Sequence, residues 1–204
     1  MGSQHAARRL HYLSAMHSLA AHAATGLWRR ALWLALLVLG LETARTLAGR
    51  GPGWASPSLL LGGLALCLMA VRSSPATLGL GWHRLPERLL GGLGLAVVLL
   101  LPAAARWGGG PSLGPELALA AIAVSVGEEI AFRGVLFSAL LDLGGPALAV
   151  LGSTALWTIA HALAHPPQFL PAVAGAGLLL GLWRWACQDL VGPIVGHVLA
   201  DLAL

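Results

Sequence analysis

The sequence predicts an all-α fold, a membrane-embedded bundle of about seven transmembrane helices. The first reason is composition: of the 204 residues, 57% are hydrophobic and only 10% are charged. A soluble domain carries about 25% charged residues, so this chain has too few polar side chains to cover a surface in water. The second reason is pattern, because the apolar runs are long and continuous, whereas the strands of a membrane barrel alternate over about 10 residues. A disordered chain and a disulfide scaffold are also excluded, by the high hydrophobicity and by a cysteine count of two.

Seven apolar segments meet or approach the roughly 20 residues that a membrane span needs. In order, they are residues 28–48, 54–71, 89–106, 115–141, 146–164, 168–186 and 190–204. Clusters of proline and glycine, such as Gly144-Gly145-Pro146, separate them. We therefore predict one integral membrane domain over residues 27–204. It follows a polar segment over residues 1–26, where apolar residues recur with a spacing that allows an interfacial amphipathic helix.

The distribution of arginine predicts how the chain sits in the membrane. All twelve basic residues are arginine. Four of them lie in the leader through Arg30 and three lie between residues 72 and 88, whereas only Arg106 flanks the loop near residues 107–114. By the positive-inside rule the N-terminus is cytoplasmic, and we expect a bacterial inner (cell) membrane. A break in the first span near Glu42 would invert this orientation. The net charge of +4 thus relates to topology, and we expect no nucleic-acid partner.

Ionisable residues inside the predicted spans are concentrated in the second half of the chain. A charge at the bilayer centre costs about 2.5 to 3.5 kcal/mol on insertion scales, so such residues are candidates for function. They are Glu128, Glu129 and Arg133 in the fourth segment, His161 in the fifth, and His197 and Asp201 in the seventh. Their number on three helices favours a shared polar site over separate structural roles.

Helix geometry gives these residues different roles. Glu129 and Arg133 are spaced i,i+4 and can pair on one face. Glu128 is rotated by about 100° from Glu129 and has no partner in the adjacent sequence. A buried carboxylate without a partner is a stronger base than an exposed one, which suits a general base. The same i,i+4 spacing relates two further pairs, His197 with Asp201 and Trp157 with His161.

Three strings of residues, in this order, resemble the motifs of the CAAX protease and bacteriocin-processing (CPBP) family. The strings are Glu-Glu-x-x-x-Arg at residues 128–133, Trp-x-x-x-His at 157–161 and His-x-x-x-Asp at 197–201. This family includes the Ras-converting prenyl-protein endopeptidases, and the resemblance covers about residues 113–204. It implies an intramembrane glutamic endopeptidase, a hydrolase, whose catalytic part is this region.

The resemblance also implies a role for each residue. Glu128 with His161 would activate a water, and His197 with Asp201 would form the oxyanion site. Glu129 and Arg133 would hold the fourth helix in register. The second motif usually begins with Phe, where this chain has Trp157, and the third often ends in Asn. Because an ionised Asp only accepts hydrogen bonds, we expect His197 to be the oxyanion donor and Asp201 to orient it.

The expected substrate is a peptide or a membrane protein cleaved near the bilayer. Maturation of a peptide, or removal of a C-terminal sorting helix as in the related myxosortases, suits this chain better than processing of prenylated proteins. No cofactor is expected.

A metallopeptidase is a less favoured alternative, because His161 and His165 are spaced i,i+4 but lack the glutamate of His-Glu-x-x-His, and Pro166 is expected to end the helix at His165. The non-enzymatic alternative is a membrane scaffold, an immunity protein or a carrier that uses the same polar groups.

Overall fold

The computed structural model describes residues 2–104 and 113–203, with side chains for residues 24–101 and 113–203. All regular structure in these ranges is helical, so the all-α prediction is confirmed. The elements are α1 (Gly2–Ala48), α2 (Ala55–Leu68), α3 (Pro75–Leu78), α4 (Leu85–Ala104), α5 (Pro115–Glu128), the π-helix η1 (Glu129–Leu136), α6 (Phe137–His161), the short 3₁₀ helix η2 (Pro167–Phe169), α7 (Leu170–Cys187) and α8 (Val191–Ala203).

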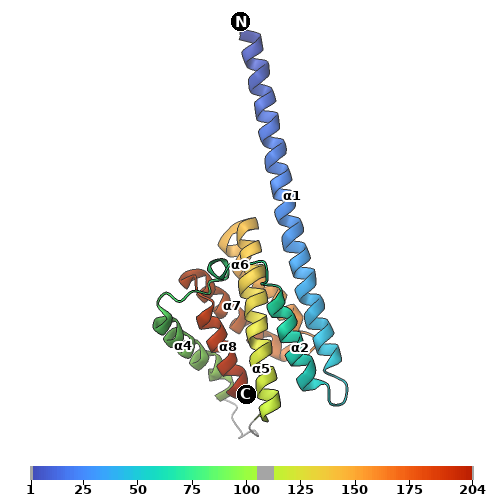
Figure 1. The fold of residues 1–204 in the computed structure, drawn as a ribbon, viewed down its shortest axis with the longest axis vertical. Coiled ribbons are helices and arrows are strands. Elements are labelled where there is room, and N and C mark those ends of the chain that lie inside the picture. The colour runs from blue at the N-terminus through green and yellow to red at the C-terminus, as the bar shows by residue number, and fades with distance from the viewer. Residues whose placement is uncertain (1, 105–112, 204) are drawn as a thin grey trace.

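Helix α1 runs without interruption from Gly2 to Ala48, and its N-terminal part extends away from the body of the molecule (Figure 1). The helix does not break at Glu42, so the alternative that would have inverted the topology does not apply. The predicted polar segment over residues 1–26 continues directly into the first apolar segment. The histidines of residues 1–26 and the predicted amphipathic face of this segment lie outside the side chains that the structure describes.

Three helical stretches in the described part of the chain are long and apolar enough to cross a membrane. They are Ala24–Ala48, Pro115–His161 and Pro167–Cys187, and α2 and α8 are shorter apolar helices. Helix α1 begins at Gly2, well before the predicted residue 28, whereas the other helices match the predicted segments within a few residues, for example α7 against the predicted 168–186. The exact number of membrane spans stays a prediction.

The long stretch from Pro115 to His161 contains two irregularities that shape the site. At Gly144 and Gly145 the backbone leaves the helical conformation, and Gly145 has φ +75°, which favours glycine. The chain reverses direction there, between the predicted fourth and fifth segments (Figure 1). Directly after Glu128 the helix widens into η1, and wide turns of this kind occur frequently at functional sites.

Helices α2 and α5 touch backbone to backbone. A Cβ atom added to Gly63 would lie 2.3 Å from the carbonyl oxygen of Ala123, and one added to Gly127 would lie 2.4 Å from the carbonyl oxygen of Gly63. Small residues allow such close approach between helices in membranes. The first half of the chain is therefore fixed against α5 at the residue that precedes Glu128.

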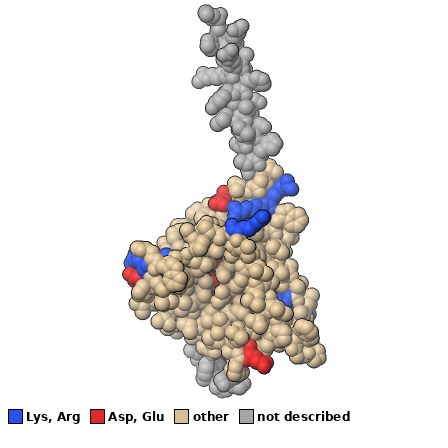
Figure 2. All heavy atoms as spheres, in the orientation of Figure 1, with Lys and Arg blue, Asp and Glu red and all other residues tan. Residues whose placement is uncertain are grey.

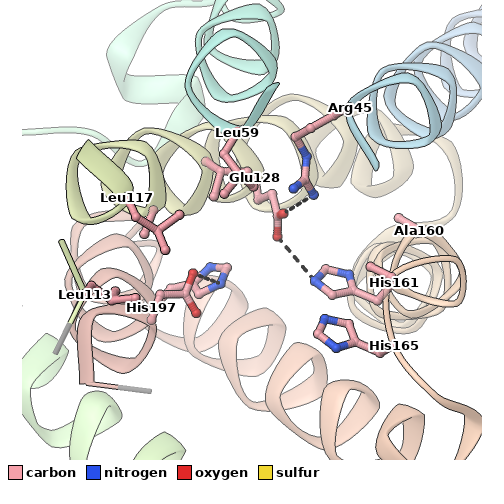
Figure 3. A pocket seen from close by; sticks show the side chains of 13 residues that line it. Arg45, Leu59, Leu113, Leu117, Glu128, Ala160, His161, His165 and His197 are labelled. Carbon is pink, nitrogen blue, oxygen red and sulfur yellow. Dashed lines mark hydrogen bonds and ion pairs between the residues drawn. The ribbon is translucent and has the colours of Figure 1, made fainter. Parts of the chain in front are cut away.

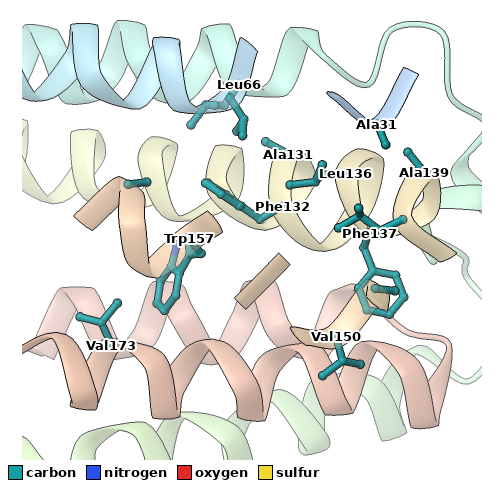
Figure 4. Packing of buried hydrophobic residues seen from close by; sticks show 14 residues of the cluster. Ala31, Leu66, Ala131, Phe132, Leu136, Phe137, Ala139, Val150, Trp157 and Val173 are labelled. Atoms are coloured by element: carbon teal, nitrogen blue, oxygen red, sulfur yellow. The ribbon is translucent and has the colours of Figure 1, made fainter. Parts of the chain in front are cut away.

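The largest apolar cluster surrounds η1. Phe132 and Leu136 are fully buried, and Trp157 of α6 and Val173 of α7 pack in the same cluster (Figure 4). The widened helix thus lies inside the bundle, so that any polar side chain it carries is held in dry surroundings.

The two ends of the molecule differ in charge. Uncharged side chains cover most of the visible body, and arginine gathers near the point where α1 leaves it (Figure 2). We call this the arginine-rich end. Arg29 and Arg30 lie on α1, and the segment from the end of α2 to the start of α4, which runs on the same side of the body (Figure 1), carries Arg72, Arg84 and Arg88. There, Arg30 pairs with Asp142 at 3.3 Å, tying α1 to the turn in α6. At the opposite end, Arg50 donates to the carbonyl of Leu163 at 3.0 Å, and Arg106 lies outside the described residues.

Candidate active site

A cavity of about 270 Å³ lies between α1, α2, α5, α6 and α8. Its lining includes Arg45 near the end of α1 and Leu117 near the start of α5, which lie at the end opposite the arginine-rich one (Figure 1). The carboxylate of Glu128 points into this cavity towards His161 (Figure 3). Its apolar lining is Leu59, Leu113, Leu117, Ala121, Val124, Ala160 and Ala164, and its polar lining is Arg45, Glu128, His161, His165, His197 and Asp201.

Glu128 is held by donors from two other helices. Arg45 of α1 donates from Nη2 to Oε1 at 3.0 Å, and Trp157 of α6 donates from Nε1 to Oε2 at 2.7 Å. The expectation that Glu128 is an unpaired carboxylate is therefore wrong. Its partners come from positions 83 and 29 residues away in the chain, which no local pattern shows. Two donors fix the carboxylate in its ionised form, since an ionised carboxylate only accepts hydrogen bonds.

His161 faces the same carboxylate oxygen as Trp157. Its Nδ1 lies 2.9 Å from the carbonyl of Trp157, so Nδ1 carries a proton, and in the neutral ring Nε2 then presents a lone pair. The distance from Nε2 to Oε2 of Glu128 is 3.7 Å, which is long for a direct hydrogen bond. A water bound in the pocket can contact both atoms across this gap.

The end of α6 also differs from the prediction. The helix ends at His161, four residues before the predicted His165, because a turn already begins there ahead of Pro166. His165 folds back and stacks on the ring of His161, with 5.5 Å between ring centroids and 8° between planes. The turn thus gives His161 a second aromatic neighbour at the mouth of the pocket.

His197 of α8 lies between two carboxylates. Its Nδ1 is 3.0 Å from Oε1 of Glu129, and its Nε2 is 3.4 Å from Oδ2 of Asp201. Both contacts are attractive only when both ring nitrogens carry protons, so the geometry favours the imidazolium. The closer carboxylate is Glu129, so Glu129 orients His197 at least as directly as Asp201 does. Oδ2 of Asp201 lies 2.7 Å from the Ser125 hydroxyl.

Arg133 anchors this arrangement from inside the core. Its side chain is fully buried and donates from Nη1 to Glu129 at 2.9 Å, as the i,i+4 spacing indicates. Its guanidinium lies over the Trp157 ring, 4.3 Å from the centroid. Arg133 therefore supports two residues that line the pocket. It contacts Glu129, which holds His197, and it contacts Trp157, which holds Glu128.

Of the residues that we singled out from the sequence, Glu128, His161, His197 and Asp201 line this cavity. Trp157 and Glu129 contact these residues, and Arg133 contacts Trp157 and Glu129. Sequence reasoning missed Arg45 and Ser125, and it considered His165 only for the metallopeptidase alternative. Arg45 was visible only as a local partner of Glu42, and no signal in the sequence linked it to Glu128. In the part of the chain that the structure describes, no three His, Cys, Asp or Glu side chains form a group suited to hold a metal ion.

The arrangement can polarise a water and stabilise negative charge a short distance away. An ionised carboxylate and a neutral imidazole accept protons on one side of the cavity, and an imidazolium donates them on the other. This combination is suited to general-base attack of water on a carbonyl group.

Comparison with known proteins bears on the region that holds these groups. Residues 110–203 match the family model described as type II CAAX prenyl endopeptidase Rce1-like. No curated protein and no solved structure matches the chain. The matched region includes α5, η1, α6 and α8, which carry Glu128, His161 and His197. Residues 110–203 are therefore similar to the Rce1-like CAAX endopeptidases, and this similarity, together with the long apolar helices, indicates an integral membrane protein with protease activity.

Proposed function

We propose that this protein is an intramembrane glutamic endopeptidase in which Glu128 and His161 activate a water and His197 stabilises the oxyanion. The observation that carries the proposal is the 3.7 Å gap between Oε2 of Glu128 and Nε2 of His161 at the inner end of a cavity that His197 also lines. Similarity to this family supports proteolysis in general, and the glutamate-dependent mechanism is our interpretation of the geometry.

In the first step, water bound in the gap loses a proton to Glu128 and its oxygen attacks the scissile carbonyl carbon. Nε2 of His161 accepts the second hydrogen of the water as a hydrogen bond and so orients a lone pair towards the substrate. The carbonyl π bond opens, and the electron pair moves to the oxygen. Positioned general bases contribute about 10²-fold to 10⁴-fold to the rate of such steps.

In the second step, the tetrahedral intermediate collapses. Nε2–H of His197, which lies 3.4 Å from Asp201 in the structure, turns to donate to the oxyanion, while Glu129 holds the ring through Nδ1. The C–N bond breaks, and Glu128 returns its proton to the leaving amine. Removing one oxyanion donor typically costs about 10²-fold to 10³-fold in rate.

The proposed substrate is an apolar peptide or a membrane protein segment. Leu113 and Leu117 line the side of the cavity away from His161 and His165 (Figure 3), and Leu59 also lines it, so the cavity favours apolar side chains next to the scissile bond. A myxosortase-type role in removing a C-terminal helix is compatible with this lining and stays a prediction. No step of the mechanism uses a cofactor.

The direct test uses the purified full chain in lipid nanodiscs with a pool of quenched-fluorescent peptides that carry apolar segments. We expect the wild type to cleave a subset of the pool, and mass spectrometry identifies the bond. The peptide cleaved fastest is the reporter peptide for the experiments below. Absence of any cleavage by well-folded wild type would contradict the proposal.

We also propose that the N-terminus is cytoplasmic and that the cavity opens on the outer face of the membrane. The arginine-rich end lies on the N-terminal side of the molecule, and the positive-inside rule assigns that end to the cytoplasm. The cavity opens at the other end, beside the loop that follows α1. The scissile bond would then lie in an extracytoplasmic segment near the membrane surface.

Cysteine labelling tests this orientation. In a chain whose Cys67 and Cys187 are replaced by Ser, we expect Ala55→Cys to react with an impermeant maleimide in intact spheroplasts. Ala76→Cys, exposed at the arginine-rich end, is expected to react only after lysis. The reverse labelling pattern would show that the cavity opens to the cytoplasm.

Trp157→Phe tests the hydrogen bond to the proposed base. Phe is the usual residue of the motif, so the variant should fold, but it loses the 2.7 Å contact from Nε1 to Glu128. A hydrogen bond to a charged group contributes about 1.5 to 3 kcal/mol, so we expect kcat on the reporter peptide to fall roughly 10-fold with little change in KM. Trp33→Phe, on the exposed surface of α1, is the matched control. Equal kcat in both variants would show that the indole N–H has no catalytic role.

A further inference from the structure

We propose that Arg45 is a positioning residue for Glu128, so that the site requires α1 as well as the Rce1-like region. This inference rests on the proposed function, because it assigns Arg45 a role through the general base. Arg45 and its helix lie outside the matched residues 110–203, and the family resemblance says nothing about them.

The first observation is a chain of charges that crosses from α1 to α5. The guanidinium Nη2 of Arg45 hydrogen-bonds both to Oε1 of Glu128, at 3.0 Å, and to Oε2 of Glu42. The side chains are largely removed from solvent, with exposed fractions of 12% for Arg45 and 1% for Glu42. Because buried charges are costly in a membrane, two carboxylates around one arginine are not expected as incidental packing.

The second observation is that α2 leaves room for Arg45. A Cβ atom on Gly62 would lie 2.4 Å from Cδ of Arg45, so only glycine fits there while Arg45 keeps its conformation. The neighbouring Gly63 contacts Gly127, the residue before Glu128. Gly62 and Gly63 of α2 thus make room for Arg45 and hold α5 in place next to Glu128, the residue that Arg45 binds.

The third step is what these contacts do in the reaction. Arg45 occupies Oε1 of Glu128 and so leaves Oε2 directed towards Trp157, His161 and the bound water. Its positive charge keeps Glu128 ionised before the reaction. When Glu128 takes up a proton, Arg45 still has Glu42 as a partner, so the arginine stays in place for the return of the proton. This role as a second partner of Arg45 explains why α1 carries the buried Glu42, which takes no other part in the mechanism.

Removing Arg45 alone would leave two buried carboxylates without their shared cation, so the test uses the charge-balanced variant Arg45→Met/Glu42→Gln. The ionisable groups that then remain around Glu128 are His161 at the end of α6, His165 in the turn after it, Glu129 and Arg133 of η1, and His197 and Asp201 of α8. Without the adjacent cation Glu128 binds its proton more tightly. We therefore expect kcat on the reporter peptide to fall about 10-fold to 100-fold and the acid limb of its pH profile to move to higher pH.

Three further variants separate positioning from packing. Arg45→Lys keeps the charge and is expected to restore the acid limb, although not the full kcat. Gly62→Ala displaces the arginine without changing any charge and is expected to lower kcat and leave KM unchanged. Gly40→Ala, on α1 with no atom near its added Cβ, and Arg50→Met, at the same end of the molecule, are the controls and should behave as wild type.

The inference would be overturned if the folded Arg45→Met/Glu42→Gln variant kept the wild-type kcat and pH profile. It would also be overturned if that variant lost kcat equally at all pH values and the Arg45→Lys variant showed the same loss. If the double variant does not fold, Gly62→Ala decides, because wild-type kcat in that variant would contradict positioning by Arg45. Failure of the proposed function is a separate outcome, in which the wild type itself cleaves no peptide.

Discussion

Glu128→Gln is expected to lower the rate of reporter-peptide cleavage by about 10³-fold or more while leaving the protein folded in the membrane. The amide keeps the size of the side chain and can still accept the hydrogen bond from Trp157. It cannot take up the proton of the attacking water, and a positioned general base is worth about 10²-fold to 10⁴-fold. The measurement is kcat on the reporter peptide in nanodiscs, with thermal unfolding to check the fold.

The matched control for this substitution is Glu116→Gln, an exposed glutamate at the start of the same helix. It should cleave at the wild-type rate, because Glu116 lies outside the lining of the cavity. Substantial cleavage by folded Glu128→Gln would contradict the assignment of Glu128 as the base. Loss of a cellular phenotype only in Glu128→Gln would in addition argue against a scaffold or immunity role, since such roles do not need a proton acceptor.

Arg133→Met is expected to cause the largest loss of stability of any single substitution considered for this site. Arg133 is fully buried, pairs with Glu129 at 2.9 Å and lies over Trp157 at 4.3 Å. Removing one partner of a buried ion pair costs about 3 to 5 kcal/mol, because the remaining charge loses its compensation. The measurement is the free energy of unfolding in mild detergent, or the shift in Tm.

Two comparisons make this prediction specific. Arg30→Met removes an exposed pair with Asp142, in which both side chains are about half exposed, and should cost less than about 1 kcal/mol. Arg133→Met/Glu129→Gln removes both charges and should recover part of the lost stability. A small effect in Arg133→Met, similar to that in Arg30→Met, would show that the buried pair is not structural.

The sequence predicted the features of this site that depend on one helix at a time. The i,i+4 spacing brings Arg133 to Glu129 at 2.9 Å and Asp201 to His197 at 3.4 Å, since residues with this spacing lie on one face of a helix. Long apolar runs located the helices after α1 within a few residues, and Gly144-Gly145 marked the reversal between two of them. These are local properties, and a single sequence contains them.

The contacts between helices could not be predicted in this way. Arg45 pairs with Glu128 across 83 positions, and the sequence suggested only its neighbour Glu42. Trp157 fills the place of a phenylalanine by size, yet its indole N–H is a donor to Glu128, which the substitution pattern did not reveal. The π-helix η1 had no sequence signal either, and its residues Phe132 and Leu136 are buried by other helices that a single sequence does not place.

The most direct test of the account is an experimental structure with a phosphinate analogue of the reporter peptide, whose tetrahedral phosphorus carries two oxygens in place of the attacking water and the oxyanion. We predict one oxygen between Glu128 and His161, and the other within hydrogen-bonding distance of Nε2 of His197. The analogue should also bind at least about 10²-fold more tightly than the uncleaved peptide. A phosphinate bound outside this cavity, or with its oxygens turned away from Glu128 and His197, would contradict the proposed mechanism.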